Sequence, residues 1–180
     1  MERIILLSDL WGIEKSEWIH FYLEILQNYF VVEFYDSCDL GNIDTTEYTE
    51  EKLHQQFLDG GIETAVKNLL ERENQISTVL GFSVGGYIGW KAVLAGLKIA
   101  GLFAVSSTRI RYEDKKPSGT IELYYGEEDN FKPNTEWFRK LELKENIYKK
   151  EEHNLYQKKE IAESICKKII THSRLKRTKI

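Results

Sequence analysis

The sequence predicts an α/β protein whose open, mostly parallel sheet is covered by helices on both faces. Short apolar runs rich in β-branched residues alternate with amphipathic stretches along the chain. The first four runs are almost continuously apolar, as expected for parallel strands buried on both faces. A length of 180 residues suits one domain with one sizeable core. Because alternating strands and helices form right-handed βαβ units, we expect a three-layer α/β/α sandwich with about six parallel strands.

The strands are predicted from the apolar runs. In order along the chain, they are residues 4–7, 30–35, 78–82, 99–105, 121–125 and 146–150. Ligands of open α/β sheets bind beyond the carboxyl ends of the strands. The loops that follow these runs are therefore where functional residues are expected.

The helices are predicted from apolar residues at helical spacing between the strands. They are residues 15–28, 62–71, 85–97, 135–141 and 158–170. The first carries a stripe that we interpret as a core face, namely Trp18, Tyr22, Ile25 and Tyr29. Between residues 37 and 59, Thr46 or Thr49 could begin a helix, and the sequence leaves both open.

Composition excludes several classes of protein. A hydrophobic content of 42% and an aromatic content of 12% argue against disorder, and no apolar run is long enough for a membrane span. Cys38 and Cys166 make neither a disulfide framework nor a C-x-x-C metal pair. The start of the chain becomes acidic at Asp9, too soon for a secretory signal. We therefore predict a cytoplasmic protein that contacts neither membranes nor nucleic acid.

Basic residues gather at the C-terminus although the net charge is −4. From Lys167 onward there are six basic residues and no acidic one. We expect residues 1–170 to form a single domain and residues 171–180 a basic tail. This tail is interpreted as a solvated terminus, and the alternative is a patch for an acidic partner.

The strongest motif is Gly81-Phe82-Ser83-Val84-Gly85, between a predicted strand and a predicted helix. G-x-S-x-G in this context is typical of a nucleophile elbow, in which the serine occupies a strained turn with positive φ. Glycines are needed because a Cβ two residues to either side would collide with neighbouring chain. The motif fits neither the P-loop pattern nor the dinucleotide fingerprint G-x-G-x-x-G.

An elbow predicts an acid and a histidine later in the chain, each on a loop after a strand. Asp129 follows the fifth predicted strand and His153 follows the sixth. In this hypothesis His153 accepts the proton of Ser83, and Asp129 orients the imidazole. Glu127 or Glu128 could replace Asp129 as the acid.

The other histidines are weaker candidates. His20 and His54 lie on predicted helices before the serine, and His172 lies in the basic tail. The four histidines show no spacing of the H-E-x-x-H kind, so we expect no metal site.

With these motifs the chain resembles the α/β-hydrolase superfamily, in a small lidless form similar to carboxylesterases and dienelactone hydrolases. The resemblance covers residues 4 to about 170. It implies Ser83, Asp129 and His153 as the catalytic triad. It also implies an oxyanion hole made by the backbone N–H groups of Val84 and Leu10, with Trp11 as the next candidate.

The chain departs from that family in three places. The family's common His-Gly after this strand is replaced by Ser8-Asp9, which places a carboxylate near a developing oxyanion. The family's first two strands are missing, because residue 4 already matches its third. Residues 106–119 are too few for a lid. The resemblance therefore implies an open pocket, walled by residues 37–59, Trp11, and Arg109 or Arg111, and the two arginines could bind an anionic substrate.

These observations predict a serine hydrolase that cleaves a carboxylic ester, or less readily a thioester, without a cofactor. A narrower hypothesis is a methyl esterase that acts on acyl groups linked to an acidic carrier protein. The alternative from another class is a non-catalytic binding protein on a hydrolase scaffold. A flavodoxin-like nucleotide binder would share the sheet but lacks a phosphate loop.

Overall fold

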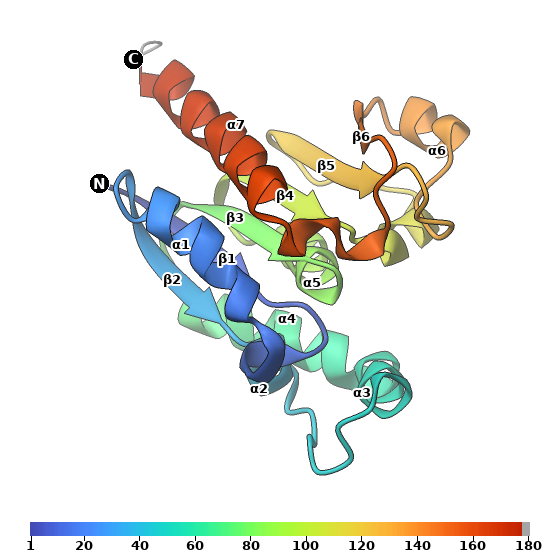
Figure 1. Ribbon diagram of the computed structural model, residues 1–180. Helices are drawn as coiled ribbons and strands as arrows, with labels where there is room; N and C mark the ends of the chain where they lie inside the picture. Colours follow the sequence, from blue (N-terminus) through green and yellow to red (C-terminus); the bar gives the residue numbers. More distant parts are fainter. Residues whose placement is uncertain (178–180) are drawn as a thin grey trace.

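A single six-stranded parallel sheet organises the computed structural model, which describes residues 1–177 (Figure 1). The strand order is β2-β1-β3-β4-β5-β6. The strands are β1 (Glu2–Leu7), β2 (Phe30–Tyr35), β3 (Ser77–Phe82), β4 (Ile99–Val105), β5 (Ile121–Gly126) and β6 (Glu145–Tyr148). All six predicted strands are confirmed, with ends that differ from the prediction by no more than two residues.

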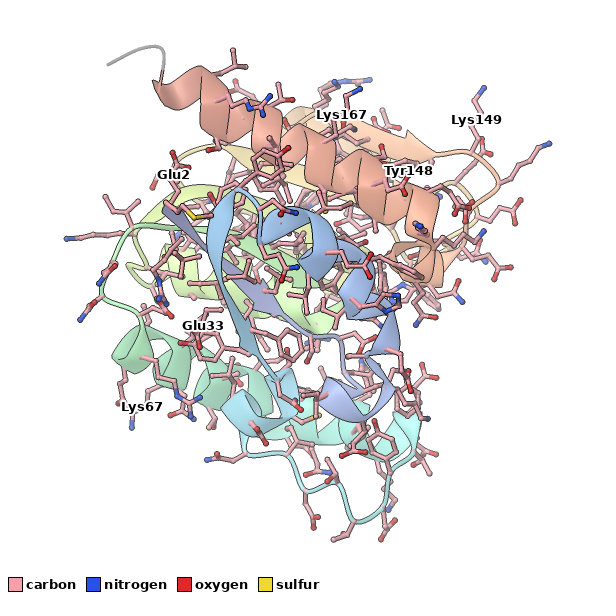
Figure 2. The ribbon with its side chains drawn as sticks, turned by 60° about the vertical axis from the view of Figure 1, so that its left-hand side comes forward. Glu2, Glu33, Lys67, Tyr148, Lys149 and Lys167 are labelled. Atoms are coloured by element: carbon pink, nitrogen blue, oxygen red, sulfur yellow. The ribbon has the colours of Figure 1, made fainter. Side chains whose placement is uncertain are left out.

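Helices cover both faces of this sheet, which confirms the three-layer sandwich. Successive residues of β1 point to opposite faces: Ile4 and Leu6 belong to one buried cluster, and Ile5 and Leu7 to the other. In Figure 1, α1 (His20–Leu26) and α7 (Lys159–Arg177) lie side by side on one face. The other face packs against α4 (Ile62–Arg72), α5 (Val84–Leu94) and α6 (Thr135–Lys140). Charged residues such as Lys67 and Lys149 project outward (Figure 2).

The first predicted helix is shorter than expected. Residues 12–19 form two 3-10 turns, η1 (Gly12–Lys15) and η2 (Glu17–Ile19), and only α1 is α-helical. Trp18 and Tyr22 are buried as predicted, but Tyr29 is 39% exposed. The helix ends at Leu26, so the helical spacing no longer places Tyr29 on the core face.

Between β2 and β3 the chain forms three helical segments before α4. They are α2 (Ser37–Gly41), α3 (Glu50–Gln56) and η3 (Phe57–Gly61). The Asp36 side chain caps α2, and the Thr49 hydroxyl accepts the Lys52 N–H at the start of α3. Of the two predicted caps, Thr49 is the correct one.

The C-terminal helix extends beyond its predicted end at residue 170, because α7 continues to Arg177. Ser173 is buried and its hydroxyl donates to Glu2, while the His172 ring packs against Phe103. Up to Ser173, the segment predicted as a solvated tail is therefore packed on the domain. The last predicted tail residues, 178–180, lie outside the described part of the chain. None of the described helices has the length and apolar character needed to cross a membrane.

The strand order places a crevice between β1 and β3. The chain runs from β1 to β2 at one edge and then returns to β3 on the other side of β1. At such a switch point the chain leaves the two strands toward opposite sides of the sheet, which leaves room for a ligand between their loops. The loops that begin at Ser8 and Ser83 therefore lie on either side of this crevice.

Candidate active site

Ser83 occupies a strained turn between β3 and α5. Its φ and ψ are 49° and −118°, which confirms the positive φ predicted for an elbow. A Cβ on Gly81 would lie 2.4 Å from the Cα of Gly86, and one on Gly85 would lie 2.3 Å from the Ser8 carbonyl oxygen. Only glycine therefore fits on either side of the serine.

The three predicted side chains form one hydrogen-bonded chain. The Oγ of Ser83 lies 3.1 Å from Nε2 of His153, and Nδ1 of His153 lies 2.8 Å from Oδ2 of Asp129. Asp129 follows β5, and His153 begins η5 (His153–Gln157) after β6. The hydroxyl of Ser106, at the end of β4, donates to the backbone carbonyl of His153. Loops after four strands therefore assemble the site.

Asp129 is held as a carboxylate. Burial acts to raise its pKa, but hydrogen bonds from His153 and the Phe131 N–H outweigh burial and hold the pKa below its ordinary value. An ionised acid beside Nδ1 keeps Nε2 free to accept the serine proton. Of the alternative acids, Glu127 accepts the Lys150 N–H and Glu128 is exposed.

The other histidines do not join this chain. His20 is exposed beside the carbonyl of Glu17, and His172 lies near the carbonyl of Ala100. No group of three metal-ligating side chains occurs among the described residues.

A small cavity beside Ser83 is lined by the two residues predicted to supply the oxyanion donors, Val84 and Leu10. Val84 is the first residue of α5, where N–H groups have no acceptor within the helix. The Trp11 N–H donates to Oδ1 of Asp9 at 3.0 Å, so the alternative donor is already engaged. Val84 and Leu10 both line the cavity.

Asp9, which replaces a glycine of the family pattern, is fully buried. Its Oδ1 accepts the Trp11 N–H, and its Oδ2 accepts the Tyr156 hydroxyl at 2.9 Å. Burial raises the pKa of Asp9 to about 6, although both hydrogen bonds act to lower it. Both oxygens of the Asp9 carboxyl are thus hydrogen-bonded, one by Trp11 in the same loop and the other by Tyr156 in η5, which also carries His153.

We expect Asp9→Asn to stabilise the protein at neutral and alkaline pH. The folded-state pKa of Asp9 is above that of an unfolded chain, so folding favours its protonated form. The wild type should lose stability as the pH rises from about 4 to about 6, by about 3 kcal/mol at most, and asparagine should avoid this loss.

Urea unfolding of both proteins at pH 5 and pH 8 tests this expectation. The variant's advantage should grow with pH, because other titrating groups affect both proteins equally. If the free energies of unfolding of the two proteins changed with pH in parallel, burial of the Asp9 carboxylate would not be what destabilises the wild type.

A small cavity of about 60 Å³ lies beside Ser83. Its lining residues come from four stretches of the chain: Leu10; His54, Phe57, Leu58 and Ile62; Ser83 and Val84; and Thr108 and Arg109. Residues 37–59 and Arg109, both predicted to border a pocket, therefore contribute to its wall.

Two predicted pocket residues lie elsewhere. Trp11 packs edge-on against Tyr48, with the Lys15 ammonium 3.7 Å from its ring centroid. Arg111 donates to the backbone carbonyls of Thr108 and Phe131. Neither residue lines the cavity: Trp11 is engaged by Tyr48 and Lys15, and Arg111 by two backbone carbonyls.

Sequence reasoning did not identify several neighbours of the site. Ile62 and Thr108, outside the predicted wall of residues 37–59, line the cavity, and Tyr156 binds Asp9. Tyr156 could have been found, because it lies three residues after His153. Ile62 gave no signal, since it belongs to the apolar face of a predicted helix.

Comparisons with known proteins show likeness in structure only. No protein-family model matches the chain, and no curated protein matches it. A metagenomic α/β hydrolase from sediments of the Mar Chica lagoon, Morocco, aligns with a TM-score of 0.66 at 15% identity, over 99% of this chain and 92% of its own. The monoacylglycerol lipase of Paleococcus ferrophilus aligns with a TM-score of 0.63 at 14% identity, over 94% of each chain.

A further match is a serine hydrolase without a lid from Xanthomonas campestris. Its TM-score is 0.55 at 14% identity, over 95% of this chain and 81% of its own. Together with the strand order and the elbow, these likenesses define the α/β-hydrolase fold. More particularly, the chain has the small form without a lid domain: in the described structure, only η4 (Thr108–Tyr112) stands between β4 and β5.

Proposed function

We propose that the protein is a serine hydrolase that cleaves carboxylic esters of short acyl groups. The observation that carries the proposal is the continuous hydrogen-bonded chain from Ser83 through His153 to Asp129 at a strained elbow. Hydrolases among the solved structures of the same fold support the general class. Thioesters are the second choice of substrate.

In the proposed reaction, Ser83 Oγ attacks the ester carbonyl carbon while His153 Nε2 accepts its proton. The carbonyl oxygen becomes an oxyanion that the Val84 and Leu10 N–H groups stabilise. His153 then returns the proton to the leaving alkoxide, and an acyl-serine remains. Water, deprotonated by His153, hydrolyses this acyl-enzyme and releases the acid.

The cavity supports short acyl groups. The cavity of about 60 Å³ is small for a ligand site, so it suits an acyl group of only a few non-hydrogen atoms. Phe57, Leu58 and Ile62 make one wall apolar. Longer acyl chains would have to extend out of the cavity or displace these side chains.

A carrier-linked substrate receives less support from the fold. The prediction rested on the basic residues near the C-terminus. The end of α7 contacts Glu2 and Ala100, at the starts of β1 and β4, through Ser173 and His172. Ser83 follows the opposite end of its strand, so this part of α7 lies away from the site (Figure 1).

Labelling with a fluorophosphonate, followed by peptide mapping, tests the proposal. We expect the label on Ser83, because only an activated serine reacts. p-Nitrophenyl acetate should be turned over with a kcat/KM at least about 10-fold above that of the octanoate, since the cavity is small.

Folded protein that neither takes the label nor hydrolyses any ester would contradict the proposal. The alternative, a binding protein on a hydrolase scaffold, would then be favoured.

A further inference from the structure

We propose that Arg109 selects esters that carry a carboxylate close to the scissile bond. This inference rests on the proposed function and names its substrate class. It starts from three polar residues that line the cavity beside Ser83, namely His54, Thr108 and Arg109.

The charge of Arg109 is not neutralised by a neighbouring carboxylate. In residues 1–177, no acidic side chain lies within ion-pair distance of its guanidinium. The guanidinium carbon lies 5.8 Å from the ring centroid of Tyr87 and 5.6 Å from that of Tyr112. Aromatic faces position a guanidinium without neutralising it.

The acid that binds Tyr87 is engaged by another cation. Glu113 Oε1 accepts the Tyr87 hydroxyl at 2.6 Å and lies 3.4 Å from the Lys91 ammonium. Lys91 thus offsets the charge of Glu113, and a positive charge remains at the cavity.

The two carboxylates of the active site do not face this cavity. Asp129 binds His153, and Asp9 binds Trp11 and Tyr156. Neither is among the residues that line the cavity. An anion that enters beside Ser83 therefore meets Arg109 without a competing carboxylate on the cavity wall.

A carboxylate suits this site for geometric reasons. A guanidinium offers parallel N–H donors that bind both oxygens of a carboxylate, and it stays charged at all working pH values. Because Arg109 is half-buried, solvent weakens this interaction less than at an exposed arginine. The small volume places the carboxylate only a few bonds from the ester carbonyl.

Pairs of esters that differ only in charge test the inference. Monoethyl succinate is compared with ethyl levulinate, in which a methyl ketone replaces the carboxylate of the acyl part. Acetoxyacetate is compared with acetoxyacetone, which makes the same change in the alcohol part. Hydrolysis is followed by acid release at constant pH, and the readout is the ratio of kcat/KM within each pair.

For the wild type, we expect the charged ester to be preferred at least about 10-fold in one of the pairs, and that pair tells which side of the ester faces Arg109. Arg109→Gln should lower this preference by about 10- to 100-fold, which corresponds to the free energy of losing a hydrogen bond to a charged group. The matched control is Arg111→Gln, two residues away and outside the cavity, which should leave the ratio within about twofold.

The inference is overturned if the wild type turns over the neutral esters but prefers the charged one in neither pair. It is also overturned if the Arg109 and Arg111 variants change the ratio equally. Failure of the proposed function would look different: none of the esters would be hydrolysed and Ser83 would take no fluorophosphonate label.

Discussion

Replacing Ser83 by alanine is expected to lower kcat for ester hydrolysis by about 10⁴- to 10⁶-fold, because no other group in the site can form the acyl-enzyme. The Oγ of Ser83 is the atom that meets Nε2 of His153 at the elbow. Turnover of p-nitrophenyl acetate under saturating conditions measures the loss.

A measurement of stability distinguishes this loss of kcat from misfolding of the variant. Alanine carries the same Cβ as serine, so the backbone strain at φ 49° is unchanged. We expect the free energy of unfolding to stay within about 1 kcal/mol of wild type. A variant that retains most of the wild-type rate would disprove the role of Ser83, and with it the proposed mechanism.

Replacing Gly85 by alanine is expected to destabilise the protein by about 3 kcal/mol and to lower kcat at least about 10-fold. A Cβ at this position would lie 2.3 Å from the Ser8 carbonyl oxygen and 2.5 Å from that of Leu7. Both contacts are backbone atoms at the end of β1, so relief requires the loop that begins at Ser8 and carries Leu10 to move. Urea unfolding and ester turnover measure the two effects.

Gly89, one turn further along α5, provides the matched control. A Cβ there would meet side-chain atoms rather than backbone, namely those of Leu102, Val79 and Leu7 at 3.1, 3.2 and 3.5 Å. Alanine also favours the helix over glycine by about 1 kcal/mol. We expect Gly89→Ala to change stability by less than about 1 kcal/mol and to leave turnover near wild type. Equal losses in the two variants would mean that contact with the backbone of Leu7 and Ser8 is not the cause.

Helix boundaries that depend on neighbours in the sequence could be predicted correctly, whereas those that depend on contacts between distant residues could not. Thr49 as a helix cap could be named from the sequence because a cap depends on residues within one turn. The end of the helix before Tyr29 could not, because it depends on where β2 joins the sheet. Likewise, α7 continues past residue 170, where Ser173 and His172 contact Glu2 and Ala100, which are distant in the sequence.

The alternation of strands and helices and the elbow at Ser83 could be predicted from the chain, because they depend on local periodicity or on neighbours within a few residues. The order of Asp129 and His153 could be predicted because the elbow motif places its partners on later loops. That Arg109 lines the cavity while Arg111 does not is evident only in the folded protein. The same is true of the bond between Asp9 and Tyr156, 147 residues away. Burial, charge and hydrogen bonding at the site come from loops that are brought together only by the parallel sheet.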